Sequence, residues 1–401
     1  MYGLLTCMTV DTVAKFTPAY SLKELVLYFL KLGTWGFGGP VALVGYMHRD
    51  LVEKKQWLTE EEYREGLALA QLAPGPLAAQ LGIYIGFVHY GWLGAIFTGL
   101  AFVLPSFIMV VLLGMAYQLY SGLAWMREVF YGVGAAVIGI ISISAYKLTL
   151  KSVGKINVEA IRSNWMLWVF YMTAVVITVV TQQEEILLFI AAGLIYMIVK
   201  APPLWLKKPQ TLPIVLATGI GFWNYSKDDL LKIAIFFIKA GTFVFGSGLA
   251  IVPFLHAGVV QDYKWLNESQ FVDAVAVAMI TPGPVVITVG FIGYLVAGFP
   301  GAAIAALATF LPCFLFTVLL APYFKKIAKN KSIKAFVDGI TAAVIGALLG
   351  SVIIIATRSI VDIATALIAI SAVLILVYVK KIQEPYIILA SAIVGVLIKS
   401  I

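Results

Sequence analysis

Two lysines occupy equivalent places in strongly apolar sequence. Lys31 stands within LYFLKLG and Lys239 within IFFIKAG, and the same Gly-Thr pair follows each of them, ending at Thr34 and Thr242. A lysine in such surroundings either extends its amine to the membrane surface or meets an anion inside the membrane. Because the arrangement occurs twice, we expect Lys31, Thr34, Lys239 and Thr242 to line an anion site.

A glycine-rich motif contains each lysine, KLGTWGFGGP at 31–40 and KAGTFVFGSG at 239–248. Small residues let the backbone approach either a ligand or a neighbouring helix, and helix packing explains any single glycine equally well. The motif residues that we expect near the ligand are Gly38, Gly39, Gly246 and Ser247.

Two Pro-Gly-Pro segments interrupt apolar sequence, in APGP at 73–76 and TPGP at 281–284. Proline lacks a backbone donor and clashes with the preceding helical turn, so each segment must break a helix. Only about 15 residues separate Pro76 from the glycine at 91, roughly 22 Å of helix, which is too short for a ~30 Å hydrocarbon core. The free N–H groups at a helix start form an anion site. We therefore expect two discontinuous or re-entrant helices whose starts face one anion, with contacts from Pro74, Gly75, Pro76, Thr281, Pro282, Gly283 and Pro284.

Two histidines and two carboxylates also recur at matching positions. Histidine as a residue type titrates near neutrality, which makes His48 and His256 candidates for proton coupling, although a structural hydrogen bond is the alternative. Glu65 and Asp273 lie in the polar helical segments 57–70 and 265–278, where they either relay protons or face solvent. Each segment opens with a capping-box pattern, Thr59 with Glu62 and Asn267 with Gln270.

The composition is that of an all-α polytopic membrane protein. Of the 401 residues, 62% are hydrophobic and only 12% are charged, too few to cover a soluble domain. The net charge of +8 is concentrated at the ends of apolar runs, the positive-inside pattern, so we expect a lipid bilayer and no nucleic acid as partner. Two cysteines give no disulfide framework, and three scattered histidines predict no metal site and no cofactor.

The chain contains an internal duplication. Residues 31–76 align with 239–284 without a gap, and the matches include lysine, histidine, tryptophan and both Pro-Gly-Pro segments. Further on, AAVIG occurs at 135–139 and again at 342–346. We expect a first transmembrane repeat at 21–200, a linker at 201–228 and a second repeat at 229–401.

The basic clusters predict that the two repeats are inverted relative to each other. We expect apolar helices at 92–118, 125–147, 165–180, 184–200, 300–324, 335–356, 360–378 and 384–398. If the basic clusters at 147–162 and 325–334 both face the cytoplasm, the equivalent turns at 89–91 and 298–300 face opposite sides. Inverted repeats with broken helices near the membrane midplane are typical of secondary transporters.

The motifs KLGTWGFGGP, WLT at 57–59 and APGP, repeated in a second half, resemble those of the chromate ion transporter family in its long-chain, two-repeat form. The resemblance covers nearly the whole chain. It implies a multi-pass protein of the cytoplasmic membrane that exports chromate, an oxyanion and sulfate analogue, driven by protons. The family pattern marks Gly38, Gly39, Pro40 and the Pro-Gly-Pro segments. The second half departs from it at 247–248, where Ser-Gly replaces Gly-Pro.

The expected function is secondary active export of chromate or a sulfate-like oxyanion by alternating access, coupled to protons. The alternatives are an oxyanion channel and a transporter whose main substrate is sulfate or another anion. The sequence offers neither a nucleophile–base pair nor a metal cluster, which argues against an enzyme. The choice among chromate, sulfate and molybdate stays open, as does the oligomeric state, a homodimer included.

Overall fold

The computed structural model describes residues 20–37, 39–120, 124–182, 186–203, 229–244, 248–323, 330–379 and 382–400, and within these ranges its regular elements are all helices. The expected linker, apart from 201–203, lies outside the described residues. So do the predicted site residues Gly38, Gly246 and Ser247.

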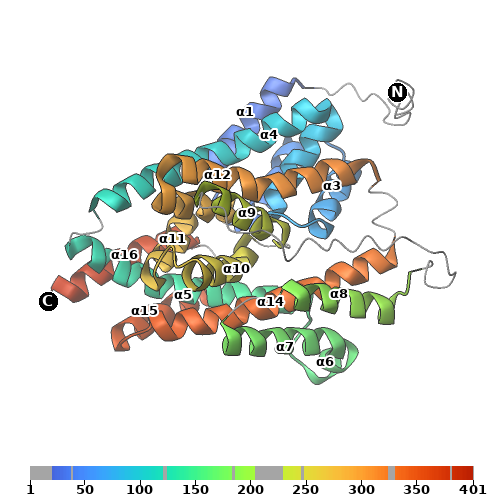
Figure 1. Cartoon of the computed structure of the whole chain (residues 1–401). Helices are drawn as coiled ribbons and strands as arrows, with labels where there is room; N and C mark the ends of the chain where they lie inside the picture. The colour runs from blue at the N-terminus through green and yellow to red at the C-terminus, as the bar shows by residue number, and fades with distance from the viewer. Residues whose placement is uncertain are drawn as a thin grey trace.

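The first half of the chain forms a series of helices that Figure 1 shows in blue to green. They are α1 (Leu22–Trp35), α2 (Gly39–Met47), η1 (His48–Lys54), α3 (Glu60–Leu72), α4 (Leu77–Tyr120), α5 (Ala124–Ser152), α6 (Val158–Ser163), α7 (Trp165–Thr181) and α8 (Ile186–Lys200).

The second half repeats this order in yellow to red. Its helices are α9 (Asp229–Thr242), η3 (Gly248–Ile251), α10 (Val252–His256), η4 (Ala257–Asp262), α11 (Glu268–Ile280), η5 (Val285–Ile287), α12 (Thr288–Leu320), η6 (Ala321–Tyr323), α14 (Lys331–Ser359), α15 (Ile363–Tyr378) and α16 (Glu384–Ser400). The expected apolar helices are confirmed in order, most with ends displaced by a few residues. The helices expected at 92–118 and 300–324 are the later parts of α4 and α12, which begin already at Leu77 and Thr288.

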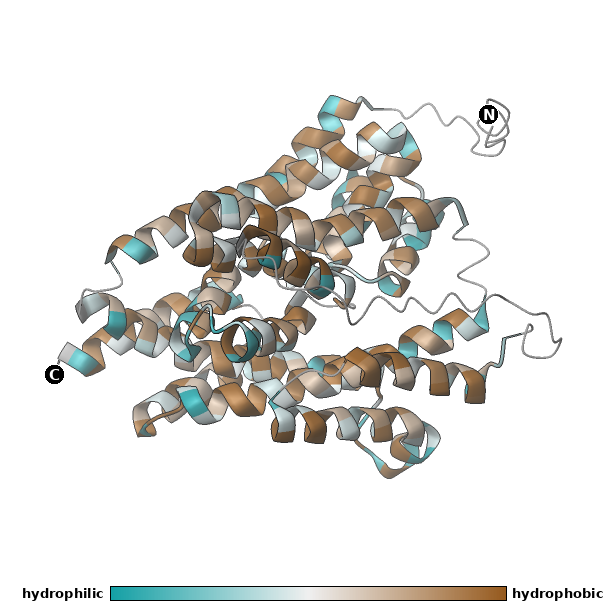
Figure 2. Ribbon diagram, in the orientation of Figure 1, coloured by the Kyte–Doolittle hydropathy of each residue, from teal (hydrophilic) through white to brown (hydrophobic). Residues whose placement is uncertain are grey.

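Several of these helices are suited to lipid. In the described part of the chain, α4, α5, α12 and α14 are long and apolar enough to cross a membrane, and α7, α8 and α15 are shorter apolar helices. Figure 2 shows that hydrophobic residues make up most of the length of the helices. Large apolar side chains point outward, among them Leu119 and Leu307, which are 69% and 66% exposed. Such exposure is stable where hydrocarbon replaces water, so the chain is a multi-pass membrane protein.

The long helices α4 and α12 each contain one sharp kink at an equivalent glycine. Gly91 has φ 63° and ψ −151°, and Gly298 has φ 61° and ψ −154°. Only glycine adopts such a conformation without strain, so the direction of both helices changes at these residues. The turns expected at 89–91 and 298–300 are therefore present. In Figure 1, α4 ends at the left of the molecule and α12 ends at the right.

The two halves are interlocked by their later helices. α5 of the first half packs against α15 and α16 of the second half, whereas α14 of the second half packs against α7 and α8 of the first. α4 and α12 also contact each other. Because each half buries a long helix against the final hairpin of the other, neither half completes its packing alone.

A cluster of aromatic rings fills the region between α9, α10 and η4 in the second half. The Phe236 ring stacks on Phe254 at 5.4 Å between centroids and meets Tyr263 and Trp265 edge-on at 5.6 and 5.8 Å. Opposite this ring is Gly258, where an added Cβ would lie 2.0 Å from the Phe236 ring. The ring occupies the space that a side chain at position 258 would need.

We predict that Gly258→Ala lowers the free energy of unfolding by about 1–3 kcal/mol, because overpacking displaces a ring held by three other aromatics. The matched control is Gly45→Ala, since a Cβ there meets nothing within 4 Å. Thermal unfolding of both variants in the same detergent measures the difference. Equal melting temperatures would contradict the tight aromatic packing.

Candidate functional site

The inner pocket is a hollow of about 330 Å³ between the two halves of the chain. The segment joining α1 to α2, the middle of α5, and the segment joining α11 to η5 form its wall. Among its lining residues are Gly39, Lys147, Thr281, Gly283 and Glu384. The pocket thus brings the first glycine-rich motif against the second Pro-Gly-Pro segment.

Hydrogen bonds fix the backbone of the second Pro-Gly-Pro segment. The Gly283 N–H donates to the Gly36 carbonyl at 3.0 Å, and the Ser106 hydroxyl donates to the Pro282 carbonyl at 2.7 Å. Gly283 has φ +94°, and a Cβ there would lie 2.0 Å from Ser106 Oγ. Both the conformation and the space therefore require glycine at this wall of the inner pocket.

The first Pro-Gly-Pro segment makes the reciprocal contact. The Gly75 N–H donates to the Val244 carbonyl at 2.5 Å. In the aligned repeats Gly75 corresponds to Gly283, and Val244 corresponds to Gly36. Each break is thus bonded to the lysine-bearing motif of the other half.

These hydrogen bonds reduce the number of backbone N–H groups that are available to bind an anion at the expected site. The N–H groups of Gly75 and Gly283 already donate to carbonyls of the chain, so they are not free to hold an anion. Of the two breaks, Thr281 and Gly283 line the inner pocket, whereas residues 74–76 are not among its lining. A shared anion between both helix starts stays a prediction, and the pocket itself involves the second break.

The charged residues of the inner pocket are Lys147 and Glu384, from α5 and the start of α16. The charge pattern of the sequence places Lys147 in a basic cluster that is expected in the cytoplasm, and it gives no indication for Glu384. One signal for Lys147 was available, because Ile140, Ser144 and Lys147 recur at helical spacing and therefore share a face of α5. All three line the pocket.

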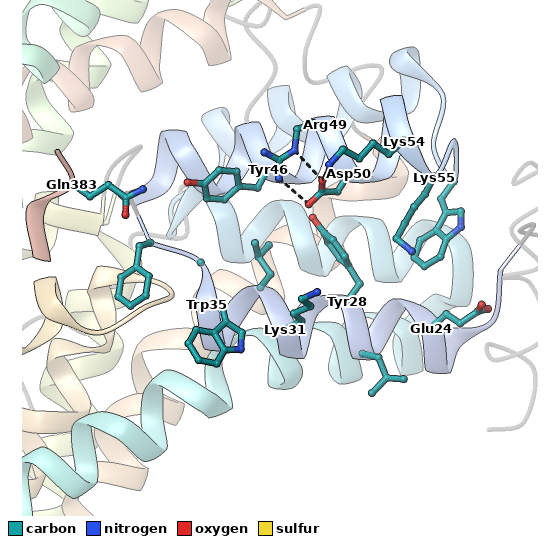
Figure 3. Close-up of a pocket in the computed structure, with 15 residues that line it drawn as sticks. Glu24, Tyr28, Lys31, Trp35, Tyr46, Arg49, Asp50, Lys54, Lys55 and Gln383 are labelled. Carbon is teal, nitrogen blue, oxygen red and sulfur yellow. Dashed lines mark hydrogen bonds and ion pairs between the residues drawn. The ribbon is translucent and has the colours of Figure 1, made fainter. Parts of the chain in front are cut away.

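The basic hollow is a second cavity of about 720 Å³ along α1 and η1, shown in Figure 3. Lys31 lines it together with Tyr28, Arg49, Asp50, Lys54 and Lys55. Gly36 and Phe37 line both the basic hollow and the inner pocket, so the two cavities adjoin each other there.

Of the four residues expected around the two lysines, Lys239, Thr34 and Thr242 line neither of these cavities. Lys239 is exposed and lines neither hollow. The hydroxyls of Thr34 and Thr242 donate to Leu30 and Ile238 carbonyls of their own helices, at 2.7 and 2.8 Å. The structure therefore brings only Lys31, of these four, to a cavity wall.

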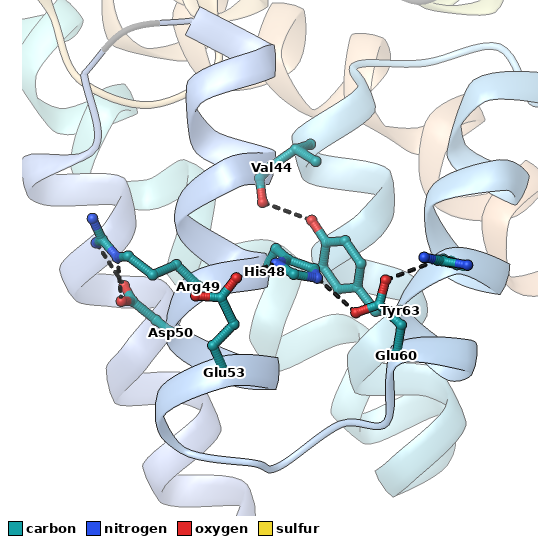
Figure 4. A network of polar contacts seen from close by, with 8 residues as sticks. Val44, His48, Arg49, Asp50, Glu53, Glu60 and Tyr63 are labelled. Carbon is teal, nitrogen blue, oxygen red and sulfur yellow. Dashed lines mark hydrogen bonds and ion pairs between the residues drawn. The ribbon is translucent and has the colours of Figure 1, made fainter.

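His48 is held by two glutamates, as Figure 4 shows. Its Nε2 lies 2.7 Å from Glu60 Oε2 and its Nδ1 lies 3.1 Å from Glu53 Oε1. The hydrogen bond to His48 lowers the pKa of Glu60 below its usual value. Beside this pair, the Tyr63 hydroxyl donates to the Val44 carbonyl at 2.6 Å and ties α3 to α2.

His256 repeats the pairing in the second half, with Nε2 2.8 Å from Glu268 Oε2. Here the histidine is only 1% exposed, and Arg358 at the end of α14 bonds both to Glu268 and to Gln182. The equivalent pairs thus differ, because the second one links α10, α11 and α14.

The two recurring carboxylates also have different surroundings. Asp273 is 4% exposed and accepts a hydrogen bond from the Tyr117 hydroxyl at 2.8 Å, whereas Glu65 is half-buried on α3. Neither residue lines the inner pocket or the basic hollow. A role for these four residues in proton coupling stays a prediction.

The long apolar helices and the charged pocket between two interlocked halves define a multi-pass helical membrane protein. The chain belongs to the chromate transporter family, since the family model described as "Chromate transporter" matches residues 23–197 and 231–396. These two matched segments give the two-domain, long-chain form. Its members are transporters and not enzymes.

Relatives align along nearly the full chain. The chromate transport protein of Cupriavidus metallidurans is 61% identical over 94% of this chain and 93% of its own length. The probable chromate transport protein of Synechococcus elongatus is 56% identical over 96% of this chain and 98% of its own length. A chromate transport protein of Pseudomonas aeruginosa is 29% identical over 84% of this chain and 81% of its own length. No solved structure is significantly similar to the chain.

The two histidine pairs lead to a prediction about stability. We expect Glu268→Gln to destabilise the protein by about 2–4 kcal/mol, because it removes the charge between a buried histidine and Arg358. Glu60→Gln, the matched control at an exposed pair, should cost less than about 1 kcal/mol. Thermal unfolding in detergent compares them, and a larger loss for Glu60→Gln would refute the asymmetry.

Proposed function

We propose that this chain is a secondary active transporter that exports chromate across the cytoplasmic membrane by alternating access. The observation that carries the proposal is the 61% identity, over nearly the full chain, to a protein described as a chromate transport protein. The inner pocket supplies a location where such a substrate would bind between the two halves.

The inner pocket has the chemistry for a small oxyanion. Lys147 supplies a positive charge, and Ser144 and Thr281 supply hydroxyl groups. The glycines at 39 and 283 leave room for the ligand to approach the backbone. Chromate and sulfate are tetrahedral dianions, so the same groups suit either, and sulfate is the alternative substrate.

The proposal includes inverted repeats. Two observations support the inversion. α4 and α12 end on opposite sides in Figure 1, whereas α6, which follows α5, and the start of α14 both lie toward the right. The lysines near the end of α5 and the start of α14 would then share the cytoplasmic side, as the positive-inside rule requires. A pocket between inverted halves opens to one side at a time when the halves rock.

Glu384 is the acidic group best placed to couple export to protons. It lines the inner pocket, where an ionised carboxylate repels a dianion. Protonation would remove this repulsion, so a proton would leave together with the dianion. The membrane potential, negative inside the cell, would then drive their net negative charge outward. The His48–Glu60 and His256–Glu268 pairs lie away from the pocket, so a coupling role for them requires transmission through η1 or α10.

We predict that Lys147→Gln reduces chromate transport at least tenfold, because a charged hydrogen bond contributes about 1.5–3 kcal/mol. The measurement is chromate uptake into everted membrane vesicles or proteoliposomes with an imposed pH gradient. Lys151→Gln is the matched control, since it removes the same charge one turn further along α5 and does not line the pocket.

Uphill accumulation driven by the pH gradient is expected of the wild-type protein. A flux that follows only the anion's own gradient would instead favour the channel alternative. Equal transport by Lys147→Gln and Lys151→Gln would contradict the assignment of the inner pocket.

A further inference from the structure

The basic hollow carries an excess of positive charge. Its charged lining residues are Glu24, Lys31, Arg49, Asp50, Lys54 and Lys55. Four of them are cations and two are anions. Figure 3 shows them along the facing sides of α1 and η1, with Lys31 between Tyr28 and Trp35.

The contacts within the hollow leave Lys31 with neither a counter-charge nor an aromatic ring beside its ammonium group. Asp50 accepts from Arg49 at 3.0 Å and lies 3.5 Å from Lys54, so one carboxylate serves two cations. The Lys55 ammonium lies 4.3 Å from the Trp57 ring centroid. Lys31 has no hydrogen-bond or ion-pair partner among the described residues. Its free charge faces the cavity.

The second half shows how the same helices pack where three of these charged residues are replaced by uncharged ones. Arg49, Asp50 and Lys55 correspond in the aligned repeats to Ala257, Gly258 and Tyr263. The tyrosines at 28 and 46 correspond to Phe236 and Phe254, whose stacked rings fill the equivalent space.

The comparison between the two halves shows whether the basic hollow is needed for the fold or for binding a ligand. The aromatic cluster shows that the fold tolerates an apolar filling at this place, so the fold itself requires neither a cavity there nor the charges of Arg49, Asp50 and Lys55. The open hollow of the first half is therefore a candidate ligand site, and its excess of positive charge favours an anion.

The hollow is connected to the inner pocket by the residues that line both. Gly36 and Phe37 occupy this position. In Figure 3, Glu24 and Lys55 mark one end of the hollow, and Gln383 marks the other. Glu384, the next residue, lines the inner pocket. The lining of the basic hollow thus extends from Lys55 past Lys31 to Phe37, where the inner pocket begins.

We propose that the basic hollow is a second oxyanion-binding site, where a tetrahedral dianion binds beside Lys31 and Arg49 before it passes Phe37 into the inner pocket. The proposal rests on the proposed function and names the entry site for the same substrate. The hollow's larger volume accommodates the anion together with water, whereas the inner pocket holds it more closely.

The test counts bound anions on the full chain in lipid nanodiscs, by equilibrium dialysis with radiolabelled chromate and, separately, sulfate. The wild-type protein should bind two anions per chain. Lys31→Gln and Lys147→Gln should each bind one, and the double variant none. Lys23→Gln, which removes an exposed charge from α1 outside the hollow, should bind two. Lys31→Arg, which keeps the positive charge, should also bind two anions. This variant therefore distinguishes an effect of lost charge from an effect of misfolding.

Transport kinetics provide the second readout. Lys31→Gln should raise the KM for chromate about fivefold, leave the maximal rate unchanged and weaken the dependence of uptake on ionic strength. Asp50→Asn should lower the KM, because it removes negative charge from the hollow.

One bound anion in the wild-type protein, with an unchanged KM in Lys31→Gln, would overturn this inference. The proposed function would survive that result if Lys147→Gln still reduced chromate uptake at least tenfold. Absence of chromate uptake by the wild-type protein would instead overturn the proposed function.

Discussion

The pair of hydrogen bonds from Gly75 to Val244 and from Gly283 to Gly36 is the constraint on which the rest of the structure depends. Each bond joins the break between two helices of one half to the lysine-bearing motif of the other. Without these bonds, two backbone donors in the apolar interior would lack partners, which costs about 1–3 kcal/mol for each group. The breaks are therefore stable only when both halves are assembled.

The two reciprocal hydrogen bonds between the halves also determine where a cavity can form. The chain on either side of each break is irregular, and irregular backbone in a membrane must be buried in protein or line a wet cavity. The first break is packed against the side chains of Gln80 and Cys313, whereas the second borders the inner pocket. The two Pro-Gly-Pro segments therefore have equivalent backbone contacts but different surroundings. The same divergence separates the basic hollow from the aromatic cluster around Phe236.

Much of the fold could be predicted from the sequence because the signals were local. The capping boxes at Thr59 and Asn267 are confirmed, since they depend on residues three apart. The glycines at 91 and 298 mark real kinks because no other residue adopts that backbone cheaply. The site was harder to predict. Lys147 and Glu384 belong to helices far apart in sequence, and only the interlocking of α5 with α16 brings them to one pocket. The repeat alone suggested that Lys31 and Lys239 are equivalent, yet the side chains around them diverged.

The central claim is that the substrate binds between the halves, beside Lys147 and the second Pro-Gly-Pro segment. Chromium scatters X-rays anomalously, so crystals grown with chromate can locate the anion without prior assumptions. We expect an anomalous peak within hydrogen-bonding distance of Lys147 Nζ, in the pocket lined by Gly39, Thr281 and Gly283. Anomalous density confined to other parts of the protein, at chromate concentrations that saturate transport, would contradict it.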